Sequence, residues 1–187
     1  VNLGLEQIRC LSVTGELKAA DKVGNQLINE IEKENLPNLK SLVYSSLGLS
    51  TWAVGDIEVA LKYIHKSLNY AEQANNRDSI VRSLVRAGGV SMEMGKYSDS
   101  RSYYESVMDM IKPTEYNYDF GILTIVYPTL FSNLAFSCAE LGEEDVSWNY
   151  LSKSLKLIDN NEYNDFTKLY VIIFSGLAGY QLGVLGK

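Results

Sequence analysis

Apolar residues recur along the chain at the three- and four-residue spacing of amphipathic α-helices, and glycines divide these helical stretches at regular intervals. The most regular stretch is GDIEVALKYIHKSLNYAE (55–72), which begins at one of these glycines. The five glycines are Gly15, Gly55, Gly95, Gly142 and Gly183. Their spacings of 40, 40, 47 and 41 residues are typical of stacked helix pairs. The pattern therefore predicts an all-α fold, an α-solenoid of antiparallel helix pairs.

The helix after each glycine has its own packing columns when the glycine is numbered as position 15. Position 20 is always small, and positions 23 and 28 are aromatic or apolar. Position 20 carries Ala20, Ala60, Ser100 and Ser147; position 23 carries Val23, Tyr63, Tyr103 and Tyr150; position 28 carries Ile28, Leu68, Met108 and Leu155. These positions share one helical face, so the second helix is expected to lie close against the first.

The helix before each glycine alternates large and small residues. Position 8 carries Ile8, Gly48, Gly88, Ala135 and Gly176; position 4 carries Gly4, Tyr44, Leu84, Phe131 and Ile172. Such alternation places a bulky side chain of one helix in a gap on its neighbour. Glycine inside a helix costs roughly 1 kcal/mol relative to alanine, so the glycines at position 8 are expected to have a packing role.

Several of these columns together resemble the tetratricopeptide repeat (TPR). The clearest repeat supplies Tyr44 at position 4, Leu47-Gly48 at positions 7 and 8, Gly55, and Ala60. The resemblance covers nearly the whole chain and implies a right-handed superhelix of about 4.5 repeats. The repeats here run to about 40 residues, against roughly 34 in the family. In this respect they resemble the longer repeats of bacterial sensors and regulators.

We expect residues 1–187 to form a single TPR-like domain, and to be a fragment of a longer protein because the sequence starts and stops inside a repeat. The expected repeats span approximately 1–36, 37–76, 77–113, 114–161 and 162–187, the last of them truncated. The connection 115–127 leads to Pro128, which either kinks a long helix or begins a new one. Asp78 or Ser79 is expected to cap the helix that follows Asn75-Asn76.

The charge balance argues against two classes of partner. The chain has 23 acidic and 17 basic residues and a formal charge of −6. Nucleic-acid binding needs clustered cations that displace counterions from phosphates, and no such cluster occurs. Anionic membrane surfaces are disfavoured for the same reason, and no apolar run is long enough for membrane insertion in this fragment. We therefore expect neither nucleic acid nor membrane as a partner.

Cysteine usage and the N-terminal sequence bear on the compartment. Cys10 and Cys138 fall in repeats that do not touch in a solenoid, so no disulfide is expected. Unpaired thiols favour a reducing compartment, and no signal peptide is visible. These features predict a cytoplasmic location, although a periplasmic sensor domain without disulfides would look the same.

The sequence predicts no catalytic, cofactor-binding or metal-binding residues. The single histidine, His65, lacks the orienting acid, nucleophile or further ligands that such a site needs. The acidic run Glu143-Glu144-Asp145 stands where a helix begins, and acids there interact favourably with the helix dipole. No phosphate-cradling GxxxxGK[ST] or GxGxxG motif occurs. The chain is therefore not expected to be an enzyme.

The remaining candidate site is a peptide-binding groove. The TPR resemblance implies that positions 2, 5, 9, 12 and 13 of the first helices face a ligand. Carrying these positions over gives the site residues Leu49, Trp52, Arg82, Val85, Met92, Ser132, Phe136 and Tyr180. Aromatic anchors beside an arginine are typical of binding hot spots. The family's clamp for a C-terminal carboxylate uses lysine at position 5, and no repeat here has one.

Two functions are compatible with this interpretation. The first is a non-catalytic scaffold that binds a protein or peptide segment, which could belong to another domain of the same full-length protein. It would be the sensory or interaction domain of a larger bacterial regulatory or signalling protein. The alternative is a homo-oligomerisation module, forming a homodimer through the apolar stretch Leu169–Leu185. For Tyr170, Ile173 and Tyr180, contact with a following repeat or domain is the alternative to a role in the groove.

Overall fold

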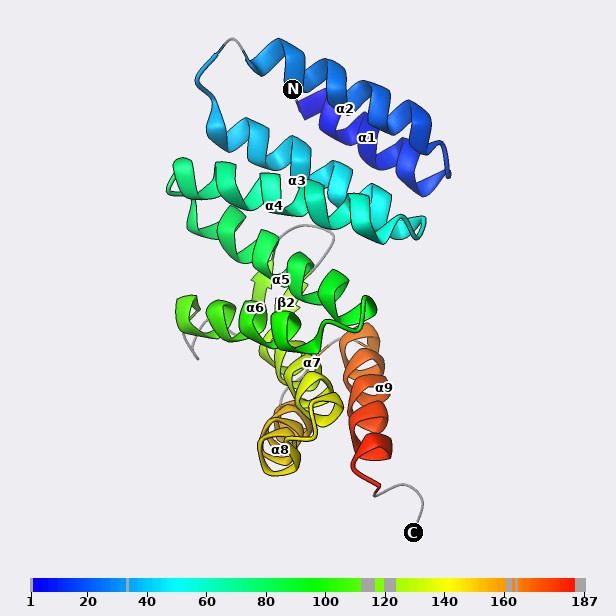
Figure 1. Ribbon diagram of the computed structural model, residues 1–187, viewed down its shortest axis with the longest axis vertical. Coiled ribbons are helices and arrows are strands. Elements are labelled where there is room, and N and C mark those ends of the chain that lie inside the picture. The colour runs from blue at the N-terminus through cyan, green and yellow to red at the C-terminus, as the bar shows by residue number, and fades with distance from the viewer. Residues whose placement is uncertain are drawn as a thin grey trace. The chain divides into compact units, whose positions relative to one another are not determined.

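The computed structural model describes residues 2–32, 34–111, 117–119, 124–160, 163 and 165–183. The chain divides into two compact units, Val1–Met94 (unit 1) and Gly95–Lys187 (unit 2). Unit 1 contains α1 (Asn2–Val13), α2 (Leu17–Glu32), α3 (Pro37–Ala53), α4 (Ile57–Gln73) and α5 (Arg77–Glu93). Unit 2 contains α6 (Tyr97–Met110), β1 (Asn117–Asp119), β2 (Thr124–Val126), α7 (Tyr127–Glu140), α8 (Glu144–Asn160) and α9 (Asp165–Gln181). The predicted all-α class is confirmed (Figure 1); the single-domain assignment stays a prediction.

The glycines that define the period lie where one helix ends and the next begins. All five adopt left-handed backbone conformations, with φ between +70° and +86°. At Gly55, the glycine N–H donates to the Trp52 carbonyl at 2.9 Å, and the Asp56 N–H donates to the Thr51 carbonyl at 3.2 Å. This pair of bonds satisfies the last carbonyls of α3, and the left-handed residue between them favours glycine. The predicted turns are therefore confirmed.

Glycines inside the helices let neighbouring helices of unit 1 approach closely. A Cβ atom on Gly48 of α3 would lie 2.7 Å from the Cγ1 atom of Ile64 on α4. A Cβ atom on Gly24 of α2 would lie 2.5 Å from the Cδ2 atom of Leu47 on α3. The expected packing role of Gly48 is thus confirmed. The core around these contacts consists of Ile8, Ala20, Leu27, Ile28, Ile31, Val43, Tyr44 and Leu47.

Buried serines join three helices of unit 1. The Ser67 hydroxyl of α4 donates to the Ser41 carbonyl of α3 at 2.9 Å and lies 2.9 Å from the Ser83 hydroxyl of α5. All three serines are buried. A buried hydroxyl without a partner would be costly, so these mutual bonds allow serine to serve where a small residue is needed. The small-residue columns therefore combine close packing with hydrogen bonding.

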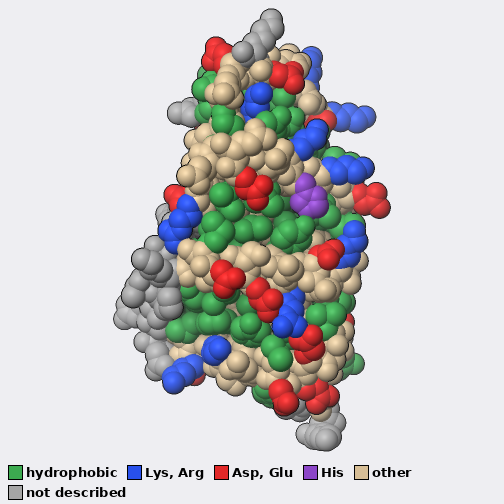
Figure 2. All heavy atoms as spheres, turned by 60° about the vertical axis from the view of Figure 1, so that its left-hand side comes forward, with side chains coloured by type: hydrophobic (Ala, Val, Ile, Leu, Met, Phe, Trp, Pro, Cys, Tyr) green, Lys and Arg blue, Asp and Glu red, His purple; other side chains and the backbone are tan. Residues whose placement is uncertain are grey.

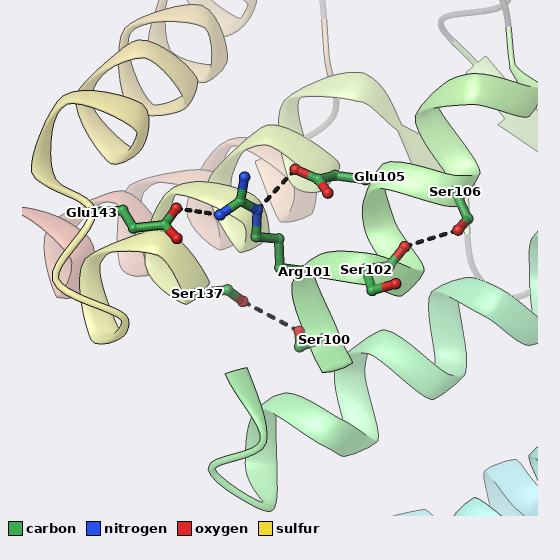
Figure 3. Close-up of polar contacts among 7 residues, drawn as sticks. All are labelled: Ser100, Arg101, Ser102, Glu105, Ser106, Ser137 and Glu143. Carbon is green, nitrogen blue, oxygen red and sulfur yellow. Dashed lines mark hydrogen bonds and ion pairs between the residues drawn. The ribbon is translucent and has the colours of Figure 1, made fainter. Parts of the chain in front are cut away.

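In unit 2, α7 packs against α6, α8 and α9. The Ser100 and Ser137 hydroxyls lie 3.2 Å apart between α6 and α7. Nearby, Arg101 of α6 forms ion pairs with Glu105, one turn later on α6, and with Glu143 at the start of α8 (Figure 3). The acidic run that begins at Glu143 therefore serves local pairing and the first turn of α8, as expected from the sequence.

Three local features differ from the sequence expectations or decide between them. Tyr127 is the first residue of α7, so Pro128 stands in the first turn of a new helix and does not kink a longer one. Ahead of it, β1 and β2 pair antiparallel, with Tyr118 opposite Ile125, a ribbon that helical periodicity did not predict. The cap of α5 is Asn76, whose side chain accepts from the Ser79 N–H at 3.0 Å; the expectation of Asp78 or Ser79 was wrong.

Candidate functional site

The candidate site of unit 1 is formed by α3 and α5, which contact each other directly. We call it the α3/α5 face and define it by Ser45, Leu49 and Trp52 of α3 and Arg82, Val85, Arg86 and Gly89 of α5. Helices α3 and α5 are the first helices of successive pairs. The TPR resemblance implies that a ligand binds to the first helices, so these two helices carry the implied positions. The face holds Leu49, Trp52, Arg82 and Val85 of the predicted set, all partly buried.

Trp52 reaches from α3 to the backbone of α5. A Cβ atom on Gly89 would lie 2.5 Å from the Cη2 atom of the Trp52 ring, so only glycine leaves room for the indole there. The ring is half-buried and still presents part of its surface to solvent. A partly exposed aromatic side chain that is fixed by a neighbouring helix is well suited to anchor a partner, because little conformational freedom remains to be lost on binding.

Arg86 is a buried cation with no acidic partner among the described residues. Its side chain is 8% exposed, and one terminal nitrogen donates to the Ser45 carbonyl at 2.7 Å and to the Ser45 hydroxyl. The Nε atom is buried and has no hydrogen-bond partner in the described part of the chain. Burial, and secondarily the charge of Arg82, lowers the pKa of the Arg86 guanidinium to about 9. The site therefore holds a positive charge that an anion at its small exposed part could neutralise.

Arg82 lies one helical turn before Arg86 and is partly buried. Burial lowers the pKa of its guanidinium, and the nearby carboxylate of Asp78 acts in the opposite direction. The predicted site thus contains Arg82 but missed Arg86, which occupies position 6 and lies outside the positions implied by the family. The sequence did contain a sign of Arg86. Arg82 and Arg86 lie four residues apart on one helix, and Asp78 lies one turn from Arg82 but two turns from Arg86.

The remaining predicted residues serve mainly as packing residues. Met92 of α5 is buried. Ser132 of α7 is fully buried, and its hydroxyl donates to the Thr129 carbonyl at 2.9 Å. Phe136 of α7 is half-buried between Tyr97 of α6, at a ring distance of 5.9 Å, and Phe174 of α9, at 6.0 Å. Met92 and Ser132 are thus buried, whereas Phe136 keeps part of its ring exposed.

Tyr180 is the most exposed member of the predicted set, with 69% of its surface accessible on α9. It belongs to unit 2, whereas Trp52 and Arg82 belong to unit 1. Within unit 2, Tyr170 of α9 donates to Asn133 of α7 at 2.9 Å, and Asn133 donates to Tyr104 of α6 at 3.0 Å. Tyr170 therefore joins α9 to α7. Ligand binding by the eight predicted residues stays a prediction.

The histidine and the two cysteines lie on different helices, and Cys10 is exposed rather than buried as a packing residue. His65 is exposed on α4, where it is the purple side chain in Figure 2. Cys10 and Cys138 are both free thiols; Cys138 is buried, and burial raises its pKa to about 11. The Cys138 thiol is therefore not activated as a nucleophile by depression of its pKa. Lysines and arginines on the face drawn in Figure 2 are mixed with acidic residues and form no basic block.

Neither a metal cluster nor a membrane span occurs within the described ranges. No group of three or more His, Cys, Asp or Glu side chains in those ranges could hold a metal ion. Among the same residues, no helix combines the length and the apolar character needed to cross a membrane. The α3/α5 face in unit 1 differs from such sites in offering a buried cation close to a half-buried aromatic side chain.

Comparison with known proteins supports the fold. No protein-family model matches the chain. Outer dynein arm-docking complex subunit 4 from Homo sapiens, Bos taurus and Mus musculus is similar at 31%, 30% and 29% identity over 106 residues. The match covers 55% of this chain and 16%, 15% and 17% of those proteins, so it spans only about one-sixth of their length. These relatives are mammalian and give no support to the expected bacterial context.

Solved structures show the same architecture over nearly the whole chain. A crystal structure of a Podosopora anserina protein assigned as a kinesin light chain, with nearly identical TPR-like repeats, matches 97% of this chain and 86% of its own. The TM-score is 0.75 at 13% sequence identity, and a point variant of the same protein gives 0.76. The likeness shows the fold alone. The TPR-like solenoid fold predicted from the repeat columns is therefore confirmed.

Proposed function

We propose that the chain is a non-catalytic protein-binding scaffold whose α3/α5 face binds a segment of another protein through one of its carboxylates. The observation that carries the proposal is Arg86, a buried guanidinium without an acidic partner in the described part of the chain, beside the half-buried Trp52. A carboxylate of an aspartate, a glutamate or a chain end, placed at the small exposed part of Arg86, would supply the missing negative charge. Charge-assisted bonds of this kind are roughly twice as strong as neutral ones.

The energetics of Arg86 favour a binding role over a purely structural one. Burial of a cation without a counter-ion is unfavourable, and an apolar side chain of similar size in its place is often neutral or stabilising. Bonds to Ser45 offset part of this cost and fix the guanidinium in one orientation. The guanidinium is already desolvated and held in one orientation, so it loses little further hydration or conformational freedom on binding. Most of its interaction with a partner's carboxylate would therefore contribute to affinity.

Trp52 adds the apolar part of the proposed contact. Its ring is held against Gly89, on the same face of α5 as Arg86 and one turn later. A segment with an acidic residue and an apolar residue next to it would meet both groups. Aromatic and arginine side chains are the residue types most enriched in hot spots. We therefore propose that Trp52 and Arg86 supply most of the affinity, with Leu49 and Val85 as flanking surface.

The wider context of this function is also a proposal. Dynein arm-docking complex subunit 4 is named as part of a complex, which supports a protein partner for this chain as well. The match covers only a small part of that protein. That a longer protein containing this chain also binds other proteins is therefore a proposal. A role as the interaction domain of such a regulatory protein, in the cytoplasm, is consistent with the acidic, cation-poor chain.

The experiment that tests the proposal is selection from a random peptide library, followed by affinity measurements on matched peptides. Selected peptides should contain Asp or Glu, and replacement of that residue by Asn or Gln should weaken binding about tenfold or more, corresponding to ~1.4 kcal/mol. Arg86→Met and Trp52→Ala should each abolish most of the binding.

The matched control is Arg101→Met, because Arg101 already has Glu105 and Glu143 as partners in unit 2. Peptide affinity of this variant should equal that of the wild type. If Arg86→Met binds acidic peptides as tightly as the wild type does, the proposed role of the α3/α5 face is wrong.

A further inference from the structure

The outer face of α9 is an apolar surface that no described helix covers. Its large side chains are between 44% and 70% exposed. They are Phe166, Leu169, Ile172, Ile173, Leu177 and Tyr180. At 100° per residue these six positions fall within an arc of about 140°, so they form one continuous stripe. No charged residue occurs between 169 and 181 to keep the stripe in water. We call it the α9 stripe.

Gly176 lies in the middle of the α9 stripe and has open space around it. A Cβ atom there would meet no atom within 4 Å. In α3, Gly48 occupies the same repeat position, and a Cβ atom there would collide with Ile64 of α4. Glycine at this position thus marks a place where a second helix packs closely. On α9 the same gap is present without a described helix to fill it.

The neighbouring repeat position shows the same contrast. Tyr44 of α3 is 9% exposed and stacks on Tyr70 of α4, whereas Ile172 of α9, at the same position, is 58% exposed. The α9 stripe therefore has the shape and chemistry of a surface that receives a helix. Exposed apolar surface of this extent on a soluble chain usually marks an interaction site.

We propose that α9 of a second copy of this chain covers the α9 stripe, with the two helices antiparallel across a two-fold axis. The stripe is complementary to itself. If the axis passes midway between Ile173 and Gly176, Ile173 of each copy fits over Gly176 of the other, and Leu169 opposes Tyr180. A two-fold interface requires this self-complementarity, because the same surface is used on both sides.

The amount of surface fits a dimer. The six residues, each 44–70% exposed, present apolar surface on the order of the several hundred Å² per partner that a standard interface buries. Six of the eleven exposed large hydrophobic residues in the described ranges belong to α9. The best-matched surface that this chain offers to the α9 stripe is thus a second α9 stripe.

Sedimentation equilibrium of the 187-residue protein tests the proposal. Between about 1 and 100 µM, the wild type should reach a mass of twice 20.9 kDa. Gly176→Glu places a charge at the centre of the stripe, where the monomer has room for it. This variant should weaken dimerisation at least ~100-fold, because the charge would be buried between the copies. Asn69→Glu adds the same charge at an exposed position of α4 and should leave the dimer unchanged.

Several results would overturn the proposal. The proposal is wrong if the wild type stays monomeric over the whole concentration range. It is also wrong if the Gly176→Glu variant dimerises as the wild type does. A monomer whose α9 stripe binds a peptide of residues 56–73, the α4 segment, would assign the stripe to a different helix. Should Gly176→Glu fail to fold, as judged by circular dichroism, the exposed double variant Ile173→Ser, Leu177→Ser decides instead. Peptide binding by the α3/α5 face is measured separately and does not depend on these outcomes.

Discussion

Arg86 determines the chemistry of the α3/α5 face at the scale of single residues. Its guanidinium is almost completely buried, and Ser45 supplies a carbonyl and a hydroxyl but no negative charge. A buried cation in this state lowers the stability of the fold relative to an apolar residue. Residues that are costly to the fold but keep a specific chemistry are common in binding sites. This combination gives two measurable consequences for the free energy of unfolding.

Replacement of Arg86 by methionine should preserve or increase stability while it removes peptide binding. We expect the free energy of unfolding to stay the same or rise by about 1 kcal/mol, because the desolvation cost disappears and the volume is nearly kept. Urea titration monitored by circular dichroism measures it. Arg101→Met, which loses partly exposed ion pairs, should instead cost about 0.5 kcal/mol. A loss of more than about 2 kcal/mol for Arg86→Met would show that the Ser45 contacts make Arg86 a structural residue.

The stability gain of Arg86→Met should shrink at alkaline pH. On folding, the pKa of the Arg86 guanidinium falls from its ordinary value to about 9. Between these values the unfolded chain binds more protons than the folded chain, so stability of the wild type rises with pH there. Below pH 9 both states are protonated, and the cost of the buried charge is fully present. Urea titrations of both proteins at pH 7 to about 10.5 should therefore converge, and a difference that is constant with pH contradicts the account.

At the scale of elements, helix α3 and helix α9 carry the same repeat pattern but differ in what covers them. The Gly48 position of α3 is filled by α4, whereas the Gly176 position of α9 is open. The turn after each helix is the same, since Gly55 and Gly183 are both left-handed, with φ of +86° and +71°. The same substitution in the two helices should therefore have opposite effects.

Gly48→Ala should destabilise the protein, and Gly176→Ala should stabilise it. The added methyl at residue 48 would lie 2.7 Å from Ile64 Cγ1 and 3.4 Å from the Ala60 carbonyl, so α4 must shift, at an expected cost of about 2 kcal/mol. The methyl at residue 176 meets nothing, so only the helix propensity changes, by up to about 1 kcal/mol in favour of folding. Both values come from urea unfolding in dilute solution, where self-association is absent. Equal effects of the two substitutions would contradict the packing role of Gly48.

At the scale of the whole molecule, the repeat period was the most informative feature of the sequence. Left-handed glycines and close helix pairs leave a direct trace in residue type, which is why the turn at Gly55 and the gap at Gly48 were predictable. The β1–β2 ribbon was not, because three-residue strands leave no periodic pattern. Such a segment becomes visible only in the folded chain.

The candidate site was less predictable than the fold. Repeat positions pointed to Trp52 and Arg82, whose role in binding stays a prediction, but they could not show that Ser132 is fully buried or that Met92 packs inside. They also passed over Arg86, since its importance depends on which groups surround it in space. Helical periodicity reports the face on which a residue lies, whereas burial depends on the helices that pack there.

The most direct test of the central claim follows the Nε–Hε resonance of Arg86 in heteronuclear NMR spectra, assigned by its absence in Arg86→Met. Addition of a selected acidic peptide should shift this resonance, because a negative charge then lies close to the guanidinium. The matched Asn or Gln peptide should leave it in place. If the acidic peptide binds and the Arg86 Nε–Hε resonance does not move, the proposed role of the α3/α5 face is contradicted.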